Sequence, residues 1–219
     1  MKHRMIVAIG CLLCSSGVLQ AQSLKDMFVH MPDTLSLVMS DVNRADCVDF
    51  LASNMKAQVT NRFNHTSEVK VLTDDYLQAQ VTKSSMWEMR RLPLRDTVSV
   101  VCVVKTVKAP VEDSHIRFYS SDWQELPVEE FLPVWPSADA FFRTPSPEKA
   151  DSLNELRLKA DITFIKASLS PKDNTLSFTY TTPDYLNHED REKIKLYLKP
   201  APVVYEWREG KFVRKEGEQ

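Results

Sequence analysis

Carboxylates near one arginine are the first candidates for chemistry in this chain. Asp74 and Asp75 are adjacent, Arg62 precedes them, and Asp122 and Glu125 add further acids. Two carboxyl groups about 5 to 9 Å apart can hydrolyse a glycosidic bond. These residue types therefore allow a hydrolase in which Asp74 or Asp75 converges with Arg62 in a cleft. Solvated surfaces carry many such acids, so we rank this hypothesis below a binding role.

Two cysteines, Cys47 and Cys102, could serve as nucleophiles or pair with each other. A nucleophile needs a base held by a third group, whereas Cys47 flanks an apolar helical stripe and Cys102 lies inside an apolar run. We therefore expect structural cysteines. In an oxidising compartment they could form a disulfide worth about 4 kcal/mol. Two buried free thiols are the alternative, which we favour because sequence does not show whether their Cα atoms approach.

Metal and nucleotide signatures are absent from the sequence. In residues 22–219 the histidines form no H-x-H or H-x-x-x-H pair, there is no C-x-x-C, and the paired acids lack the alternate spacing of a calcium loop. The four glycines cannot build G-x-G-x-x-G, G-x-x-x-x-G-K-[ST] or G-x-S-x-G. We expect no metal and no cofactor, and the usual fingerprints of P-loop, Rossmann and α/β-hydrolase proteins are excluded.

Two polar–aromatic clusters are typical of binding surfaces, where Trp and Tyr combine apolar area with a polar group. The first contains residues 61–63 and 73–76, and the second contains residues 122–123 with Trp135. The alternatives are that Thr73 or Asp74 caps a turn and that Trp123 closes the end of a core. The candidate binding residues are Arg62, Asp74, Asp75, Tyr76, Asp122 and Trp123.

The N-terminus has the layout of a secretory signal peptide. Lys2 and Arg4 precede an uncharged, mostly apolar run that ends near Ala21. The run is too short to span a bilayer comfortably. A lipoprotein, a membrane anchor and a buried helix are the alternatives. We predict cleavage after Ala21 and export to the periplasm or the cell exterior, with membrane contact only in transit.

Net charge limits the partners. The 219-residue chain has a formal charge of −2, which becomes −4 for residues 22–219. A nucleic-acid binder would carry a basic surface, so we expect none. At this length a single domain can bury roughly 70 % of its unfolded surface.

Apolar periodicity predicts the elements. An amphipathic helix spans residues 24–31, and a second begins at Ser40 or Asp41. The second helix carries the stripe Val42, Ala45, Val48, Leu51, Ala52 and Met55. The expected strands are residues 76–81, 86–92, 98–107, 115–119, 162–169, 176–181, 203–207 and 211–214, with helices at 152–159 and 187–198. In residues 86–92, Trp87 and Met89 lie on one face and Met86, Glu88 and Arg90 on the other. Residues 98–107 (VSVVCVVKTV) are apolar on both faces, as in a central strand.

Strands clustered as hairpins predict an α+β fold with antiparallel sheet and a few packing helices. Residues 127–147 hold five prolines and form a connector, which we expect to be ordered because its aromatic residues need cover. We predict one domain over residues 22–219, with possible subdomains 22–126 and 148–219. A weak echo between residues 116–123 and 176–185 allows two similar β-rich halves.

Seven short strings carry a family resemblance. They are Met55–Ala57, Val59–Phe63, Leu72–Leu77, Val103–Thr106, Asp122-Trp123, Phe178–Pro183 and Pro202–Trp207. Together they resemble the secreted family known as domain of unknown function 3256, from Gram-negative anaerobes of the Bacteroides type. Relatives carry glycines after the Asn-Arg-Phe string, where this chain has Asn64-His65. The resemblance implies an envelope location and one shared fold, and it brings no catalytic residue.

The sequence therefore favours a non-enzymatic envelope protein that binds another envelope protein or a peptide, for example by strand addition at a sheet edge. A hydrolase with convergent carboxylates and a carrier of a small ligand remain the alternatives.

Overall fold

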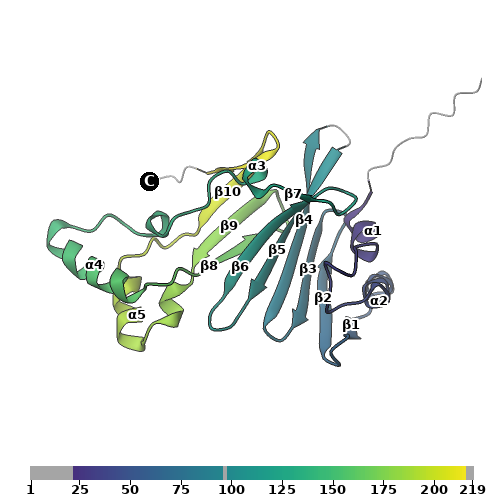
Figure 1. Ribbon diagram of the computed structural model, residues 1–219, viewed down its shortest axis with the longest axis horizontal. Coiled ribbons are helices and arrows are strands. Elements are labelled where there is room, and N and C mark those ends of the chain that lie inside the picture. The colour runs from purple at the N-terminus through teal and green to yellow at the C-terminus, as the bar shows by residue number, and fades with distance from the viewer. Residues whose placement is uncertain (1–21, 96–97, 216–219) are drawn as a thin grey trace, which may run out of the picture.

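The computed structural model describes residues 22–95 and 98–215, so the predicted signal peptide lies outside the described residues. Two antiparallel sheets form the fold, each with its strands in chain order (Figure 1). The larger contains β1 (Ala57–Thr60), β2 (Thr66–Leu72), β3 (Tyr76–Thr82), β4 (Ser85–Arg95), β5 (Val98–Val107), β6 (Asp113–Tyr119) and β7 (Glu125–Leu126). The smaller contains β8 (Ile165–Leu169), β9 (Thr175–Tyr180), β10 (Val203–Arg208) and β11 (Lys211–Arg214). The predicted α+β class with antiparallel sheets is confirmed.

Helices gather in two places. Two of them, α1 (Leu24–Val29) and α2 (Asp41–Ala52), cover one face of the larger sheet, whereas α4 (Ala150–Lys159) and α5 (His188–Lys195) lie at the other end of the molecule (Figure 1). The short helices are α3 (Val128–Phe131), η1 (Ala138–Phe141), η2 (Pro147–Lys149) and η3 (Thr182–Tyr185). No described helix has the length and apolar character needed to cross a membrane.

Strand β5 separates two apolar clusters, as its doubly apolar pattern predicts. Val101 and Val103 face α1 and α2, while Cys102 and Val104 face the smaller sheet. The predicted alternation on β4 is also confirmed, because Trp87 and Met89 belong to the helix-side cluster. The other cluster draws residues from both sheets, including Phe118 of the larger and Phe178 of the smaller.

The smaller sheet meets the larger one through the edge strand β8. The pairing of β8 with β9 leaves the amides of alternate β8 residues pointing away from β9. Side chains of β6 bind two of them: the amide of Ile165 donates to Asp113 Oδ1 at 3.1 Å, and that of Ala167 donates to Ser114 Oγ at 2.9 Å. Polar side chains thus satisfy an edge that would otherwise be open.

The buried face of α2 differs from the predicted stripe. Val42 and Met55 are 62 % and 55 % exposed, and the buried side chains are Arg44 and Cys47. The helix begins as predicted, because Ser40 caps it and Asn43 completes a capping box. The stripe was wrong at Val42 and Met55, whereas its members Val48 and Leu51 pack against the helix-side cluster. Hydrogen bonds donated by Arg44, which apolar periodicity does not record, help to select the buried face.

Strands β1 and β2 were not predicted, although they form a regular hairpin. Its turn needs no glycine, since Asn64 adopts φ 60°.

The connector of residues 127–147 is ordered, as expected. Phe131, Phe141 and Phe142 are buried, while Trp135 is 43 % exposed and packs edge-on against Phe178.

Candidate binding site

The acidic candidates do not converge with Arg62. Asp74 pairs with Lys25 at 3.5 Å, and Asp75 pairs with Arg91 at 2.6 Å. Arg62 instead bonds the carboxylate of Asp33, beside α2. The two aspartates therefore pair with cations of α1 and β4, and the cleft proposed for a hydrolase does not form from these residues.

The aromatic candidates belong to the scaffold. Tyr76 is buried and donates its hydroxyl hydrogen to Glu88 Oε1 at 2.9 Å. Trp123 is also buried and donates from Nε1 to the carbonyl of Met27 at 2.9 Å, which ties the turn after β6 to α1. Asp122, in the same turn, is exposed and bonds Ser120 Oγ through its amide. The alternative in which Trp123 closes the end of a core describes this geometry.

Both cysteines are free and buried, on opposite sides of β5. The predicted alternative of a Cys47–Cys102 disulfide is therefore wrong, since the sheet itself separates the two thiols. Burial raises the pKa of Cys47 to about 11 and also raises the pKa of Cys102. A thiol that stays protonated and buried is a poor nucleophile. Among the described residues, no group of three or more His, Cys, Asp or Glu side chains could hold a metal.

Arg44 is the most unusual side chain in the helical layer, and sequence analysis missed it. It is 1 % exposed, and its guanidinium group lies among backbone carbonyls. Nε donates to Phe28 O at 2.9 Å and Nη1 donates to Met39 O at 2.8 Å. Nη2 donates to the carbonyls of Val29 and Met31. Arg44 thereby fixes the end of α1 and the loop of residues 30–40 against α2.

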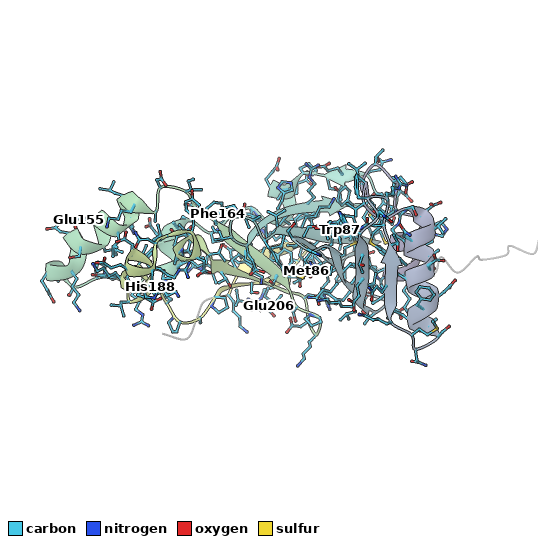
Figure 2. All side chains as sticks on the ribbon, turned by 90° about the horizontal axis from the view of Figure 1, so that it is seen from below. Met86, Trp87, Glu155, Phe164, His188 and Glu206 are labelled. Carbon is cyan, nitrogen blue, oxygen red and sulfur yellow. The ribbon has the colours of Figure 1, made fainter. Side chains whose placement is uncertain are left out.

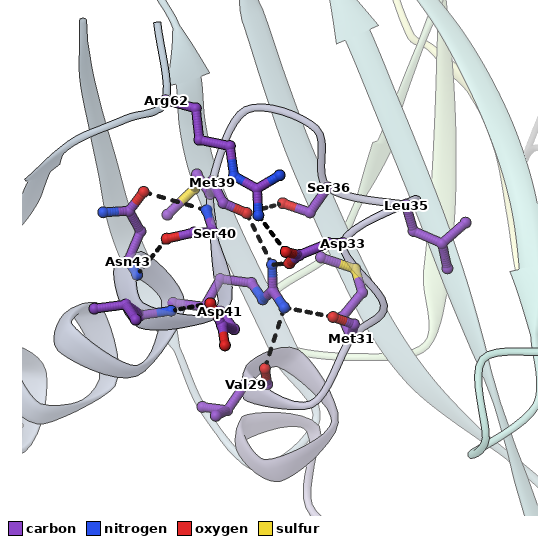
Figure 3. A network of polar contacts seen from close by, with 12 residues as sticks. Val29, Met31, Asp33, Leu35, Ser36, Met39, Ser40, Asp41, Asn43 and Arg62 are labelled. Atoms are coloured by element: carbon purple, nitrogen blue, oxygen red, sulfur yellow. Dashed lines mark hydrogen bonds and ion pairs between the residues drawn. The ribbon is translucent and has the colours of Figure 1, made fainter. Parts of the chain in front are cut away.

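Asp33 links Arg44 to the surface (Figure 3). Its Oδ1 accepts from Arg44 Nη1 at 3.2 Å, and its Oδ2 accepts from Arg62. The hydrogen bond from Arg62 lowers the pKa of Asp33, so the carboxylate is ionised at neutral pH. Burial lowers the pKa of Arg44, but the neighbouring carboxylate acts in the opposite direction. A charge-assisted network of this kind holds its members in one geometry.

A solvent-open depression of about 510 Å³ lies above this network. The ends of α1 and α2 and the loop between them supply its lining residues: Val29, His30, Met31, Asp33, Asp41, Val42, Arg44 and Ala45. Its apolar rim residue Val42 is 62 % exposed. Leu37 and Phe63 are also apolar and exposed. They are the chain neighbours of Val38 and Arg62, which are joined by a hydrogen bond from Arg62 N to Val38 O. We call the depression, together with Leu37 and Phe63, the N-terminal face.

A second polar cluster lies between the sheets. Glu88 is 3 % exposed, and its Oε2 has no hydrogen-bond partner. Burial raises the pKa of Glu88, while Tyr76, Gln78 and the amide of Leu169 oppose that shift. The nearby Arg90 donates to Asn174 Oδ1 at 2.8 Å and to Ser170 O at 2.9 Å. This cluster joins the two sheets.

Strand β11 lies at an edge of the smaller sheet, but it offers little free backbone for the addition of a partner strand. Pairing with β10 directs the amide and carbonyl of Phe212 outward, because Arg208 and Lys211 form the hydrogen-bonded pair beside the two-residue turn. Phe212 is nevertheless 1 % exposed, and α3 packs beside this strand. The N-terminal face is therefore the better candidate for a binding surface.

These features define a class: a two-sheet α+β protein with an open, rigidly supported depression on its helical side. The family model described as Protein of unknown function (DUF3256) matches residues 16–212. The chain belongs to that family, as its resemblance implied.

A solved structure has the same fold. It is described as a domain of an uncharacterized protein from Porphyromonas gingivalis W83, with 27 % sequence identity and a TM-score of 0.78. The match covers 89 % of this chain and 98 % of that chain. The comparison with curated proteins finds no match.

Proposed function

We propose that this protein is an exported, non-enzymatic binding module of the cell envelope. Its N-terminal face receives another envelope protein or a peptide. The observation that supports this role most strongly is the exposed side chain of Val42 on the rim of the depression. Burying such a side chain contributes about 1.5 to 3 kcal/mol, which is a useful part of a binding free energy.

The support beneath the depression favours binding for a second reason. Arg44 bonds carbonyls of α1 and of the loop that follows it. A surface held in one geometry loses little conformational entropy when a partner docks. An exposed apolar residue on a fixed floor is therefore better suited to recognition than the same residue on a mobile loop.

The alternatives have less support. A hydrolase would need carboxylates in one cleft, but Asp74 and Asp75 pair separately with Lys25 and Arg91. A small-ligand carrier would need an enclosed apolar cavity, whereas the depression is open to solvent.

Site-specific photocrosslinking tests the proposal. A photoreactive amino acid replaces Val42 in the full chain, with residues 1–21 intact, expressed in the organism of origin. The matched control carries it at Glu155 on α4, at the end of the molecule away from α1 and α2 (Figure 2). We expect a crosslinked partner, identified by mass spectrometry, from position 42 alone. Equal crosslinking at both positions, or none at position 42, would contradict the proposal.

A further inference from the structure

Carboxylates outnumber exposed cations around the depression and along α2, where Arg62, paired with Asp33, is 39 % exposed at its side chain. Asp33 is 44 % exposed at its side chain, and Asp41 is exposed. The one cation in the lining, Arg44, is 1 % exposed and already bonded to carbonyls and to Asp33. Asp33 is therefore already compensated by two arginines, whereas Asp41 forms no ion pair within 4.0 Å among the described residues.

The acidic character continues along α2. Residues three and four apart share a helix face, so Asp46 and Asp49 lie on the face that Val42 and Ala45 present to the depression. In the part of the chain that the structure describes, neither aspartate forms an ion pair within 4.0 Å. Asp41 and Asp49 are eight residues apart, which corresponds to about 12 Å along the helix axis.

Apolar and acidic groups thus alternate on one surface. Val29, Met31, Val42 and Ala45 supply the apolar part of the lining. Complementary partners place aliphatic side chains against such residues and cations against the carboxylates, and the cations accelerate the encounter. A purely acidic or purely polar segment would leave either the charges or Val42 uncompensated.

We infer that the partner presents a basic segment with aliphatic residues between its cations, seated on the depression and along α2. This inference rests on the proposed function and names the chemistry of the partner. The spacing of the carboxylates suits lysine or arginine residues about 12 Å apart. In an extended strand that distance is four residues, at about 3.3 Å for each residue.

Two peptides of nine residues test the inference. One carries lysines at positions 3 and 7 with leucine and valine between them, and the other has glutamates in place of the lysines. Both bear the same zwitterionic dye, and fluorescence anisotropy measures their binding to the exported protein. We expect binding of the lysine peptide only, weakened severalfold as salt rises toward about 0.5 M.

Charge-reversed variants locate the site. Asp46→Lys with Asp49→Lys should weaken lysine-peptide binding by about tenfold. The matched control, Asp151→Lys with Asp161→Lys, changes the same charge beside α4 and should leave binding unchanged. Circular dichroism checks that both variants are folded.

Several results would overturn the inference: equal binding of both peptides, no lysine-peptide binding at about 1 mM, or equal effects of the two charge reversals. Photocrosslinking at Val42 does not depend on the partner's charge. A partner captured there through an acidic segment would therefore overturn this inference and leave the proposed function standing.

Discussion

Replacing Arg44 tests the buried network beneath the depression. Arg44→Met keeps much of the side-chain length and removes all five N–H donors. The carbonyls of Phe28, Met31 and Met39 then lose buried hydrogen bonds. Leaving one buried acceptor without a partner costs about 1 to 3 kcal/mol. Asp33 is 44 % exposed at its side chain and keeps its ion pair with Arg62, so no buried charge is left unpaired. Water entering from the depression would relieve part of the cost of the unpaired acceptors.

We therefore expect Arg44→Met to lower the free energy of unfolding by about 3 to 5 kcal/mol, which is the cost of three unpaired acceptors after water relieves part of it. Urea titration followed by tryptophan fluorescence and circular dichroism measures this change. The free energy of unfolding of Arg44→Lys should lie between those of Arg44→Met and the native protein, because an ammonium group supplies three donors rather than five.

Arg62→Met is the matched control. Arg62 shares Asp33 with Arg44 but is 39 % exposed at its side chain. Exposed ion pairs contribute about 0 to 1 kcal/mol, so we expect a change in that range. The reasoning would be refuted if Arg44→Met cost less than about 1 kcal/mol or no more than Arg62→Met.

Three further predictions concern the core. Burial raises the pKa of Glu88 above its ordinary 4.5, so the folded state holds this proton more tightly than the unfolded state, and native stability falls as pH rises from about 4.5 through the raised pKa. Urea titrations at several pH values should show that the free energy of unfolding of Glu88→Gln rises relative to that of the native protein over this range. Parallel pH profiles for the two proteins would show that Glu88 does not cause the pH dependence. Trp123→Phe should cost about 1 kcal/mol and lower hydrogen-exchange protection in α1, because the bond to Met27 O is lost; unchanged exchange would contradict this role. Cys47 and Cys102 should resist a thiol reagent at pH 8 until the protein is unfolded in urea, and rapid labelling of the native protein would contradict their burial.

Local sequence patterns predicted much of the sheet architecture. The apolar run of β5 and the alternation of Trp87 and Glu88 on β4 depend on side chains that point to opposite faces of one strand. Such periodicity is visible in a sequence. Strands β1 and β2 were missed because they are shorter or more polar, although Val69 and Val71 alternate with charged residues on β2.

The helical layer was less predictable. Burial of Arg44 requires carbonyls from α1 and from the following loop, and their approach is a tertiary event. The nearest available signal was a lone arginine between Asn43 and Ala45, which ordinarily indicates a solvent-facing position. Apolar periodicity placed Val42 on the buried face, whereas it lies exposed on the rim of the depression.

The candidate residues illustrate a related limit. Tyr76 and Trp123 have the composition of a binding surface, but each has a hydrogen bond that closes the core. Asp74 and Asp75 are exposed acids whose partners, Lys25 and Arg91, come from other elements. Residue type indicates what a side chain can do, while the partners that the fold brings near it determine its role.

Hydrogen exchange with a captured partner tests the central claim most directly. The amides of the purified protein are compared with and without the partner identified by crosslinking. The account predicts increased protection within residues 29–45, together with little change in α4 and α5. Protection confined to residues 150–196, with residues 29–45 unchanged, would place binding at the opposite end and contradict the account.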